Sequence, residues 1–338
     1  MPHGWIILDK PHGLGSTQGV AAVKRNLRAV GYGKVKVGHG GTLDPLATGV
    51  LPIALGEATK LTGRMLNASK EYSFTVAFGA ETDTLDLEGQ VIATSDVRPT
   101  RAEVEAILPR FTGPIEQVPP AYSAILVDGA RAYDLARAGE AVELKARSVE
   151  VYSLQCLPGT GRGTSEAGGG ARARVPDTVG RHPLGDLHMP LYHPADGPPP
   201  RAGEDQVTFH AHVSKGTYIR SLARDLARAL GTVGHVTMLR RTRAGPFMLD
   251  SAISLDKLNE LAKGAPLENV LLPLEAGLDD IPALSFGPEQ ARAIRQGRVL
   301  TGLPQGDGLH FAREGTVPLA LVELSGGECR VVRGFNLT

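Results

Sequence analysis

The alternation of apolar and polar positions along this 338-residue chain predicts a mixture of strands and helices. Strands are expected where β-branched, aromatic or alternating apolar residues gather, at 5–9, 72–78, 149–157 and 207–213. Helices are expected after Ser16 as N-cap, after a capping box formed by Thr100 and Glu103, and over 217–230. Because these elements lack regular βαβ spacing, we expect an α+β fold on a mixed, largely antiparallel central sheet.

The amino-acid composition changes at two places along the chain. Residues 158–205 hold ten Gly and eight Pro in 48 positions, which predicts a disordered insertion because such a segment buries too little apolar surface. Its histidines have no standard ligand spacing, so no metal site is expected among them: His182, His188 and His193. After residue 280, a short helix at 288–296 and a hairpin around Gly326-Gly327 predict a small β-rich domain, 281–338, that follows a main domain, 1–280.

Composition narrows the class of protein. The hydrophobic fraction of 42% is ordinary for a globular protein, and no apolar run approaches the ~20 residues that span a bilayer. The N-terminus has no basic region followed by an apolar core, so it is not expected to be a signal peptide. Cys156 and Cys329 form no CxxC motif, which argues against a disulfide scaffold and a structural zinc site. A reduced, cytoplasmic protein is the simplest interpretation.

Charge is balanced overall but unevenly distributed. Cations predominate in 1–43 and in 214–243, whereas acids predominate in 250–280. The two basic stretches are compatible with one face that binds phosphates. On the charge pattern alone, ordinary solvated helix faces are the favoured interpretation.

The most informative stretch is GHGGTLDPLATGVLPIALGEATK at 38–60. Its glycines permit backbone conformations that a Cβ would block, and Pro45 biases Asp44 away from the helical region. The apolar run from Val50 to Leu55 is expected to be buried. An isolated Asp–Pro is usually only a turn, but a rigid loop that holds one carboxylate beside a buried run suits catalysis.

This stretch resembles the signature GHxGTLDPxAxGxLP of the TruB family of tRNA pseudouridine synthases, with every fixed position matched. Further segments resemble the same family: LDKPHGLGST at 8–17, KEYSF at 70–74, VPPAYSAILVDGARAYDLARAG at 118–139, SKGTYIRSLARDL at 214–226 and HVTMLRR at 235–241. The resemblance covers roughly 5–157 and 206–280. The small C-terminal domain more weakly resembles the PUA-type RNA-binding domain, and a structural end-cap is the alternative.

The resemblance implies the pseudouridine synthase fold and isomerisation of uridine to pseudouridine at position 55, in the T-loop of tRNA. It implies no cofactor and no obligate protein partner. Asp44 is the implied catalytic carboxylate, as a nucleophile toward base or sugar or as an ion-pair partner. The target uridine lies in a folded loop, so it must be flipped out, and His39 is implied to fill the vacated space.

The same segments imply a pocket for the flipped base. Arg220 would keep Asp44 ionised, and Tyr72 would stack on the base and offer its hydroxyl for proton transfer. Leu239 and Tyr218 would form further walls. From the residues alone, Arg220 could instead pair with Asp225, and the other side chains could be ordinary core or loop residues.

RNA contacts are expected from Lys10, Lys215 and Arg131. Leu126 and Ala130 replace lysines that are usual in the family, which should weaken phosphate contacts rather than the chemistry. Three other functions fit less well. A guide-RNA-dependent relative would carry a partner-binding terminus, a non-catalytic RNA-binding module would not need the Asp–Tyr–Arg set, and a glycoside hydrolase would need two carboxylates.

Overall fold

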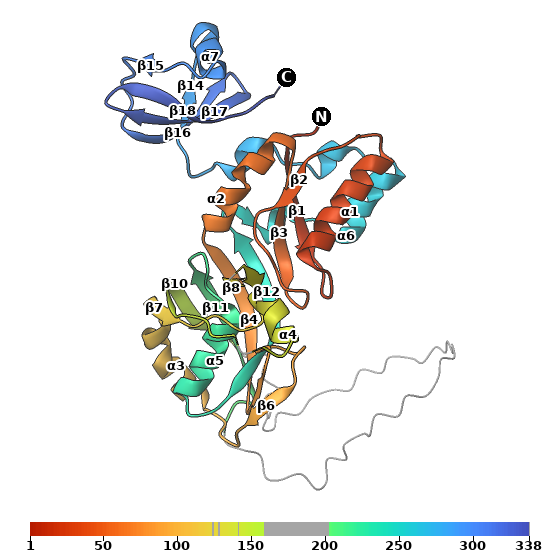
Figure 1. Ribbon diagram of the computed structural model, residues 1–338, viewed down its shortest axis with the longest axis vertical. Coiled ribbons are helices and arrows are strands. Elements are labelled where there is room, and N and C mark those ends of the chain that lie inside the picture. The colour runs from red at the N-terminus through yellow and green to blue at the C-terminus, as the bar shows by residue number, and fades with distance from the viewer. Residues whose placement is uncertain (124, 128, 141, 159–202, 338) are drawn as a thin grey trace, which may run out of the picture.

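The computed structural model describes residues 1–123, 125–127, 129–140, 142–158 and 203–337. The insertion predicted at 158–205 lies almost entirely outside the described residues, and so do its three histidines. In the part of the chain that is described, no helix is long and apolar enough to cross a membrane. Figure 1 shows a large unit around a central sheet and a small β-rich unit at one end, beside the N-terminus.

The central sheet has nine strands, of which seven form a continuous path, β1-β3-β12-β4-β11-β10-β7. In that order they are Gly4–Lys10, Thr48–Leu55, Gly234–Ala244, Lys70–Phe78, Gln206–Val213, Arg147–Cys156 and Gly113–Gln117. The other two are β2 (Val37–His39), which pairs with β3, and β13 (Phe247–Met248), which pairs with β12. Only β3 and β12 run parallel, so the sheet is mixed and largely antiparallel as predicted.

Two helix groups cover different halves of the sheet. The longer helices are α1 (Ser16–Ala29), α3 (Arg101–Ile107) and α5 (Ile219–Ala229), with the shorter α6 (Leu255–Asn259) beside α1. Leu222 and Leu226 of α5 are fully buried in one core, and Val23 and Leu27 of α1 in the other. Tyr72 and Leu239 pack against both cores and therefore lie at their junction.

The predicted helix starts are partly wrong. The capping box at Thr100 is present, since the Thr100 side chain accepts from the Glu103 amide and the Glu103 side chain accepts from the Thr100 amide. Ser16, however, is the first helical residue, and Gly15 occupies the N-cap position. The Ser16 hydroxyl instead accepts from the Leu43 amide and donates to the Leu43 carbonyl, each at 2.8 Å. A tertiary contact to the loop at 43 thus replaces the expected local cap.

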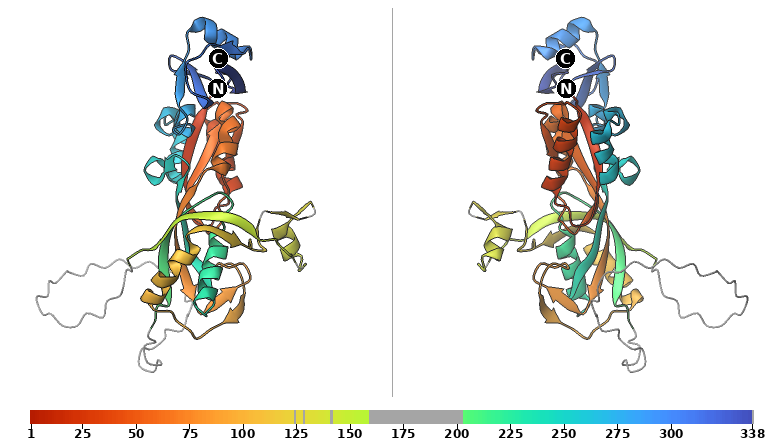
Figure 2. Two further views of the ribbon diagram at one scale, coloured as in Figure 1. Left: turned by 90° about the vertical axis from the view of Figure 1, so that its left-hand side faces the viewer. Right: turned by 90° about the vertical axis from the view of Figure 1, so that its right-hand side faces the viewer.

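The remaining elements of the large unit are short. The helices are α2 (Thr62–Asn67) and α4 (Ala132–Arg137), with 3-10 turns η1 (Gly56–Leu61), η2 (Leu108–Phe111), η3 (Leu249–Ser251), η4 (Glu260–Lys263), η5 (Leu267–Asn269) and η6 (Leu274–Gly277). Two hairpins are β5 (Ala80–Thr82) with β6 (Val91–Thr94), and β8 (Leu126–Val127) with β9 (Ala130–Arg131). Figure 2 shows that the segment with β8, β9 and α4 projects away from the central sheet.

The C-terminal unit has its own sheet, ordered β14-β16-β17-β18-β15, and one helix, α7 (Pro288–Arg295). Its strands are Ala283–Ser285, Gly308–Glu314, Val317–Ser325, Glu328–Gly334 and, for β15, Leu300–Thr301. The predicted hairpin is confirmed, since Gly326 and Gly327 join β17 to β18 with φ of 57° and 77°. This unit is docked, because Lys60 donates to the Gly334 carbonyl at 2.8 Å and Glu57 accepts from the Asn336 amide at 2.7 Å.

Candidate active site

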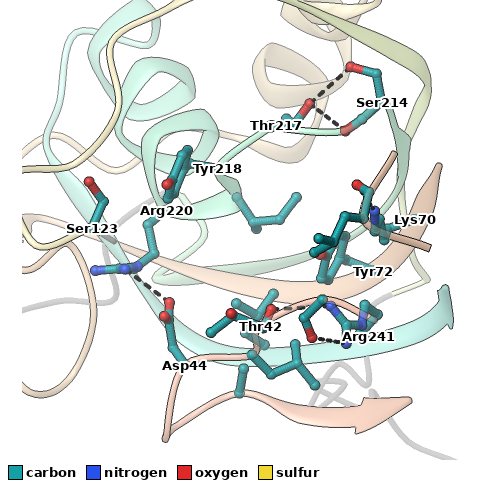
Figure 3. A pocket seen from close by; sticks show the side chains of 17 residues that line it. Thr42, Asp44, Lys70, Tyr72, Ser123, Ser214, Thr217, Tyr218, Arg220 and Arg241 are labelled. Atoms are coloured by element: carbon teal, nitrogen blue, oxygen red, sulfur yellow. Dashed lines mark hydrogen bonds and ion pairs between the residues drawn. The ribbon is translucent and has the colours of Figure 1, made fainter. Parts of the chain in front are cut away.

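A cavity of about 300 Å³ opens where the core that contains α5 meets the core that contains α1 (Figure 3). It brings together side chains from the 41–47 loop, β4, β12 and the start of α5. The predicted residues in its lining are Asp44, Tyr72, Tyr218, Arg220 and Leu239. Segments that are distant along the chain therefore converge on one site, as the motifs predicted.

Asp44 lies on a loop between β2 and β3 whose backbone is fixed from several sides. The Ala47 amide donates to the Asp44 carbonyl at 3.1 Å, which makes a tight turn at Pro45. The Gly13 amide donates to the Pro45 carbonyl at 2.9 Å, and Ser16 holds Leu43. The Asp44 side chain itself is 43% exposed, so a rigid backbone presents an accessible carboxylate.

Lys10 was expected to contact RNA, but its side chain is 0% exposed. Its ammonium donates to the carbonyls of Pro11, Leu14 and Pro45 at 3.1, 2.6 and 3.1 Å. Burial lowers the pKa of Lys10 to about 8, although the Asp44 carboxylate opposes this change. This position does not support the expected RNA contact, because Lys10 is buried against the loop that carries Asp44.

Arg220 interacts with two carboxylates and two backbone carbonyls. Its guanidinium lies 2.9 Å from Asp44 and 3.5 Å from Asp86, and it donates to the carbonyls of Thr84 and Tyr122 at 2.8 and 2.9 Å. The Arg220 side chain is only 7% exposed, so these partners fix its orientation. The alternative pairing with Asp225 is wrong, because Asp225 pairs with Arg224 at 2.8 Å.

Three of the predicted residues form part of the apolar walls of the cavity. Tyr72 of β4 and Leu239 of β12 lie on paired strands, where Tyr72 is opposite Arg241 and Leu239 is opposite Phe74. Tyr218 is the N-cap residue of α5. The Tyr218 amide donates to the Gln117 side chain at 2.8 Å, and the Arg147 guanidinium lies 5.3 Å from the Tyr218 ring centroid. Two aromatic rings and a leucine around an acid–arginine pair suit a flat, polar-edged ring such as a nucleobase.

His39 does not line the cavity. It ends β2, pairs with Ile53 of β3, and accepts a long hydrogen bond of 3.4 Å from the Gly41 amide. Burial, together with the positive charge of Arg241, lowers the pKa of the His39 imidazole. His39 is expected from the resemblance to fill the space that a flipped base leaves, and that role stays a prediction.

Two buried cations in the lining were missed from the sequence. Arg241 is 1% exposed and Lys70 is 7% exposed. The Lys70 ammonium donates to the carbonyls of Met65, Leu66 and Ala68 at 2.9, 2.8 and 2.7 Å. Burial lowers the pKa of Lys70 to about 8, with Arg241 and Lys215 adding to the effect. Both residues occur in the quoted motifs, KEYSF and HVTMLRR. The carbonyls that accept from Lys70 are close in sequence, whereas those that accept from Arg241, at Gly41, Thr42 and Val50, are distant.

The other expected RNA contacts are on the surface. Lys215 is exposed near the cavity, where its ammonium donates to the Asn67 side chain at 3.1 Å. Arg131 is exposed on the projecting hairpin. Among the described residues, no group of three or more His, Cys, Asp or Glu side chains is placed to hold a metal ion.

Comparison with known families places two segments of the chain. Residues 27–165 match the N-terminal domain of the TruB family of pseudouridylate synthases. Residues 220–279 match the C-terminal domain of tRNA pseudouridylate synthase B. The second match lies within the predicted main domain, 1–280, and ends before the small β-rich unit.

Curated relatives are similar over nearly their whole length. The chain is 64% identical to tRNA pseudouridine synthase B of Novosphingobium aromaticivorans, over 100% of this chain and 98% of the relative. It is 52% identical to tRNA pseudouridine synthase B of Zymomonas mobilis, over 99% of this chain and 96% of the relative.

Solved structures share the fold. A chain in an H/ACA ribonucleoprotein bound to a substrate RNA containing 2'-deoxyuridine aligns with a TM-score of 0.65 at 23% identity, covering 99% of this chain and 85% of its own. A chain of a Cbf5–Nop10–Gar1 complex aligns with a TM-score of 0.65 at 24% identity, covering 98% and 85%. At this identity the likeness establishes the fold alone.

Proposed function

Because this chain belongs to the TruB family of pseudouridylate synthases, we propose that it isomerises uridine to pseudouridine in tRNA, at position 55 of the T-loop. The observation that carries the proposal is the ion pair of 2.9 Å between Asp44 and Arg220, set in a cavity walled by Tyr72, Tyr218 and Leu239. The pair supplies an accessible carboxylate, and the walls fit a flat base.

The reaction is an internal rearrangement. The bond between N1 of uracil and C1′ of ribose breaks, a bond between C5 and C1′ forms, and the proton on C5 is exchanged for one on N1. Atoms and electrons balance without an oxidant, a reductant or an added group. Side chains of the cavity are therefore sufficient in principle, and we propose that no cofactor takes part.

Asp44 is proposed as the catalytic carboxylate. A carboxylate can act as a nucleophile or stabilise a developing positive charge at the sugar. The Arg220 guanidinium, 2.9 Å away, fixes the orientation of the Asp44 carboxylate. Tyr72 is proposed to stack on the base and to offer its hydroxyl for proton transfer, because it lines the same cavity. Tyr218 and Leu239 hold the base from other sides.

Entry of the uridine requires base flipping, since a base that is stacked in the RNA cannot enter the cavity beside Asp44. His39 lies outside the cavity but near the Asp44 loop, which is compatible with filling the space that the base leaves in the RNA. The exposed cations Lys215 and Arg131 are proposed to contact RNA phosphates. The 281–338 unit is proposed as a PUA-like domain that adds RNA contacts.

The proposal includes action in the cytoplasm without an obligate protein partner. The likeness to H/ACA chains concerns the fold only, whereas full-length bacterial relatives at 64% and 52% identity are named as tRNA pseudouridine synthase B. A stand-alone enzyme is therefore favoured over a guide-RNA-dependent one.

The test is incubation of the purified protein with an unmodified tRNA transcript, followed by carbodiimide labelling and mapping of pseudouridine. We expect one product, at position 55. A transcript with cytidine at that position serves as the control and should remain unmodified. Product at another position would correct the site, and no product with an intact, tRNA-binding protein would overturn the proposal.

A further inference from the structure

We propose that Arg241 is a positioning residue for the Asp44 carboxylate, an inference that rests on the proposed function of the cavity. Arg241 lies on β12 and is among the largest fully buried side chains of the described chain. Its guanidinium forms part of the cavity lining, beside the 41–44 loop (Figure 3).

The guanidinium bonds to the chain on both sides of Asp44. It donates to the carbonyls of Gly41 and Thr42 at 3.1 and 3.2 Å, and these residues precede Asp44. Its Nε donates to the carbonyl of Val50, which follows Asp44, at 2.7 Å. Because the guanidinium is planar and rigid, one group fixes the separation of the two ends of the loop.

The backbone of β12 approaches the same loop. Arg241 pairs with Gly49 in the parallel ladder between β12 and β3. A Cβ on Gly49 would lie 2.1 Å from the Arg241 carbonyl oxygen, and the φ of Gly49 is +101°. Only glycine fits this close approach at that backbone angle. The side chain and the backbone of Arg241 therefore both contact the chain between Gly41 and Val50.

Arg241 has no carboxylate partner in the described part of the chain, so its positive charge is not neutralised by an ion pair. Burying such a charge is costly, which is unusual for a residue that serves stability alone. Its field reaches across the site, since it contributes to the lowered pKa values of Lys10, His39 and Lys70.

Arg241 completes a set of contacts that occupy the loop carbonyls around Asp44. Ser16 holds the carbonyl of Leu43 at 2.8 Å, and Lys10 holds that of Pro45 at 3.1 Å. With Gly41 and Thr42 held by Arg241, the backbone on either side of Asp44 is fixed, and the carboxylate remains free to meet a substrate. A shift of about 1 Å in such a group can lower a rate about 100-fold.

The test compares Arg241→Lys and Arg241→Ala with Arg243→Lys, a matched change on the same strand. Arg243 pairs with Glu71 at 3.1 Å and does not line the cavity. For each protein, the single-turnover rate constant, the Kd for tRNA and the melting temperature are measured. We expect Arg241→Lys to lower the rate constant about 100-fold while the Kd stays unchanged. Methylguanidinium added to Arg241→Ala should restore part of the rate.

The outcomes separate this inference from the proposed function. An inactive wild-type protein would overturn the proposed function. An active wild type with Arg241→Lys equal to Arg243→Lys would overturn the role of Arg241 alone. A parallel loss of rate and RNA affinity would identify Arg241 as an RNA contact. Loss of folding in both Arg241 variants would make it a purely structural residue. Either result would overturn the positioning role of Arg241.

Discussion

The guanidinium of Arg220 lies 2.9 Å from the carboxylate of Asp44, although the first belongs to α5 and the second to a loop near the N-terminus. The same guanidinium lies 3.5 Å from Asp86 and is held by two backbone carbonyls. Arg220 is thus fixed independently of Asp44, and the carboxylate meets a pre-oriented partner.

Replacement of Arg220 by lysine should lower activity far more than RNA binding. An ammonium cannot reach two carboxylates and two carbonyls in one plane, so Asp44 would lose its orientation. We expect the single-turnover rate constant to fall on the order of 100-fold with the Kd for tRNA unchanged. Arg228→Lys, on the same helix but 57% exposed, is the control. A matching fall in rate and affinity would identify Arg220 as a phosphate contact instead.

Tyr72→Phe separates stacking from proton transfer. The ring keeps its place at the junction of the two cores, but the hydroxyl is lost. If the hydroxyl transfers a proton, the rate constant should fall by about 10²–10⁴ with binding retained. Tyr152→Phe, at an exposed tyrosine on β10, controls for the substitution. An unchanged rate in Tyr72→Phe would limit Tyr72 to stacking.

Replacement by methionine should lower the stability of the protein at Lys10 and its affinity for tRNA at Lys215. Lys10→Met leaves the partly buried Leu14 carbonyl without its donor, which should cost about 1–3 kcal/mol of stability, whereas the Pro45 carbonyl keeps its bond from the Gly13 amide. Lys215→Met, at an exposed position, should weaken tRNA binding and leave the melting temperature unchanged. Equal effects of both variants on RNA affinity alone would contradict the buried role of Lys10.

The pH dependence of unfolding gives a second test of Lys10. Its pKa is about 8 in the folded protein and 10.5 as the ordinary value, so between these pH values the unfolded chain binds more protons. Stability contributed by this group therefore rises with pH over that window and is lost as pH falls through about 8. The free energy of unfolding of the wild type, relative to Lys10→Met, should increase from pH 8 to 10.5 in denaturant titrations. A flat difference would contradict the lowered pKa.

The sequence motifs predicted which side chains would meet, because Asp44, Tyr72, Tyr218, Arg220 and Leu239 line one cavity. They did not predict which cations would be buried. A lysine or arginine is normally solvated, and the burial of Arg241 is made tolerable by carbonyls that are distant in sequence, at Gly41, Thr42 and Val50. Nothing in the local sequence records those partners.

Local patterns predicted strands well where one face is buried. β11 shows this clearly, since its buried and partly exposed residues alternate. β12 was not predicted, because its register shifts twice against β4 and its exposed and buried residues follow no period of two. Ser16 was assigned to a cap because a cap is a local bond, whereas its real partner, Leu43, is distant in sequence.

Removal of residues 160–203, replaced by a short Gly-Ser turn, should leave folding and catalysis largely intact. Almost all of this segment lies outside the described residues, but the strands that flank it are paired, with Cys156 opposite Phe209. A shorter loop between paired strands lowers the entropy cost of closure only slightly, so the melting temperature should change by little. A large fall in melting temperature or in tRNA affinity would show that the segment packs or contacts RNA.

The central claim is that Asp44 acts chemically on a uridine of tRNA, and Asp44→Asn tests it most directly. The amide is similar in size but neither charged nor nucleophilic, so the variant should fold and bind tRNA as the wild type does. Pseudouridine at position 55 is then measured by carbodiimide mapping of a transcript incubated with each protein. We predict product with the wild type and none with Asp44→Asn. Product from Asp44→Asn above about a tenth of the wild-type level, a loss of less than about 1.4 kcal/mol in transition-state stabilisation, would contradict the account.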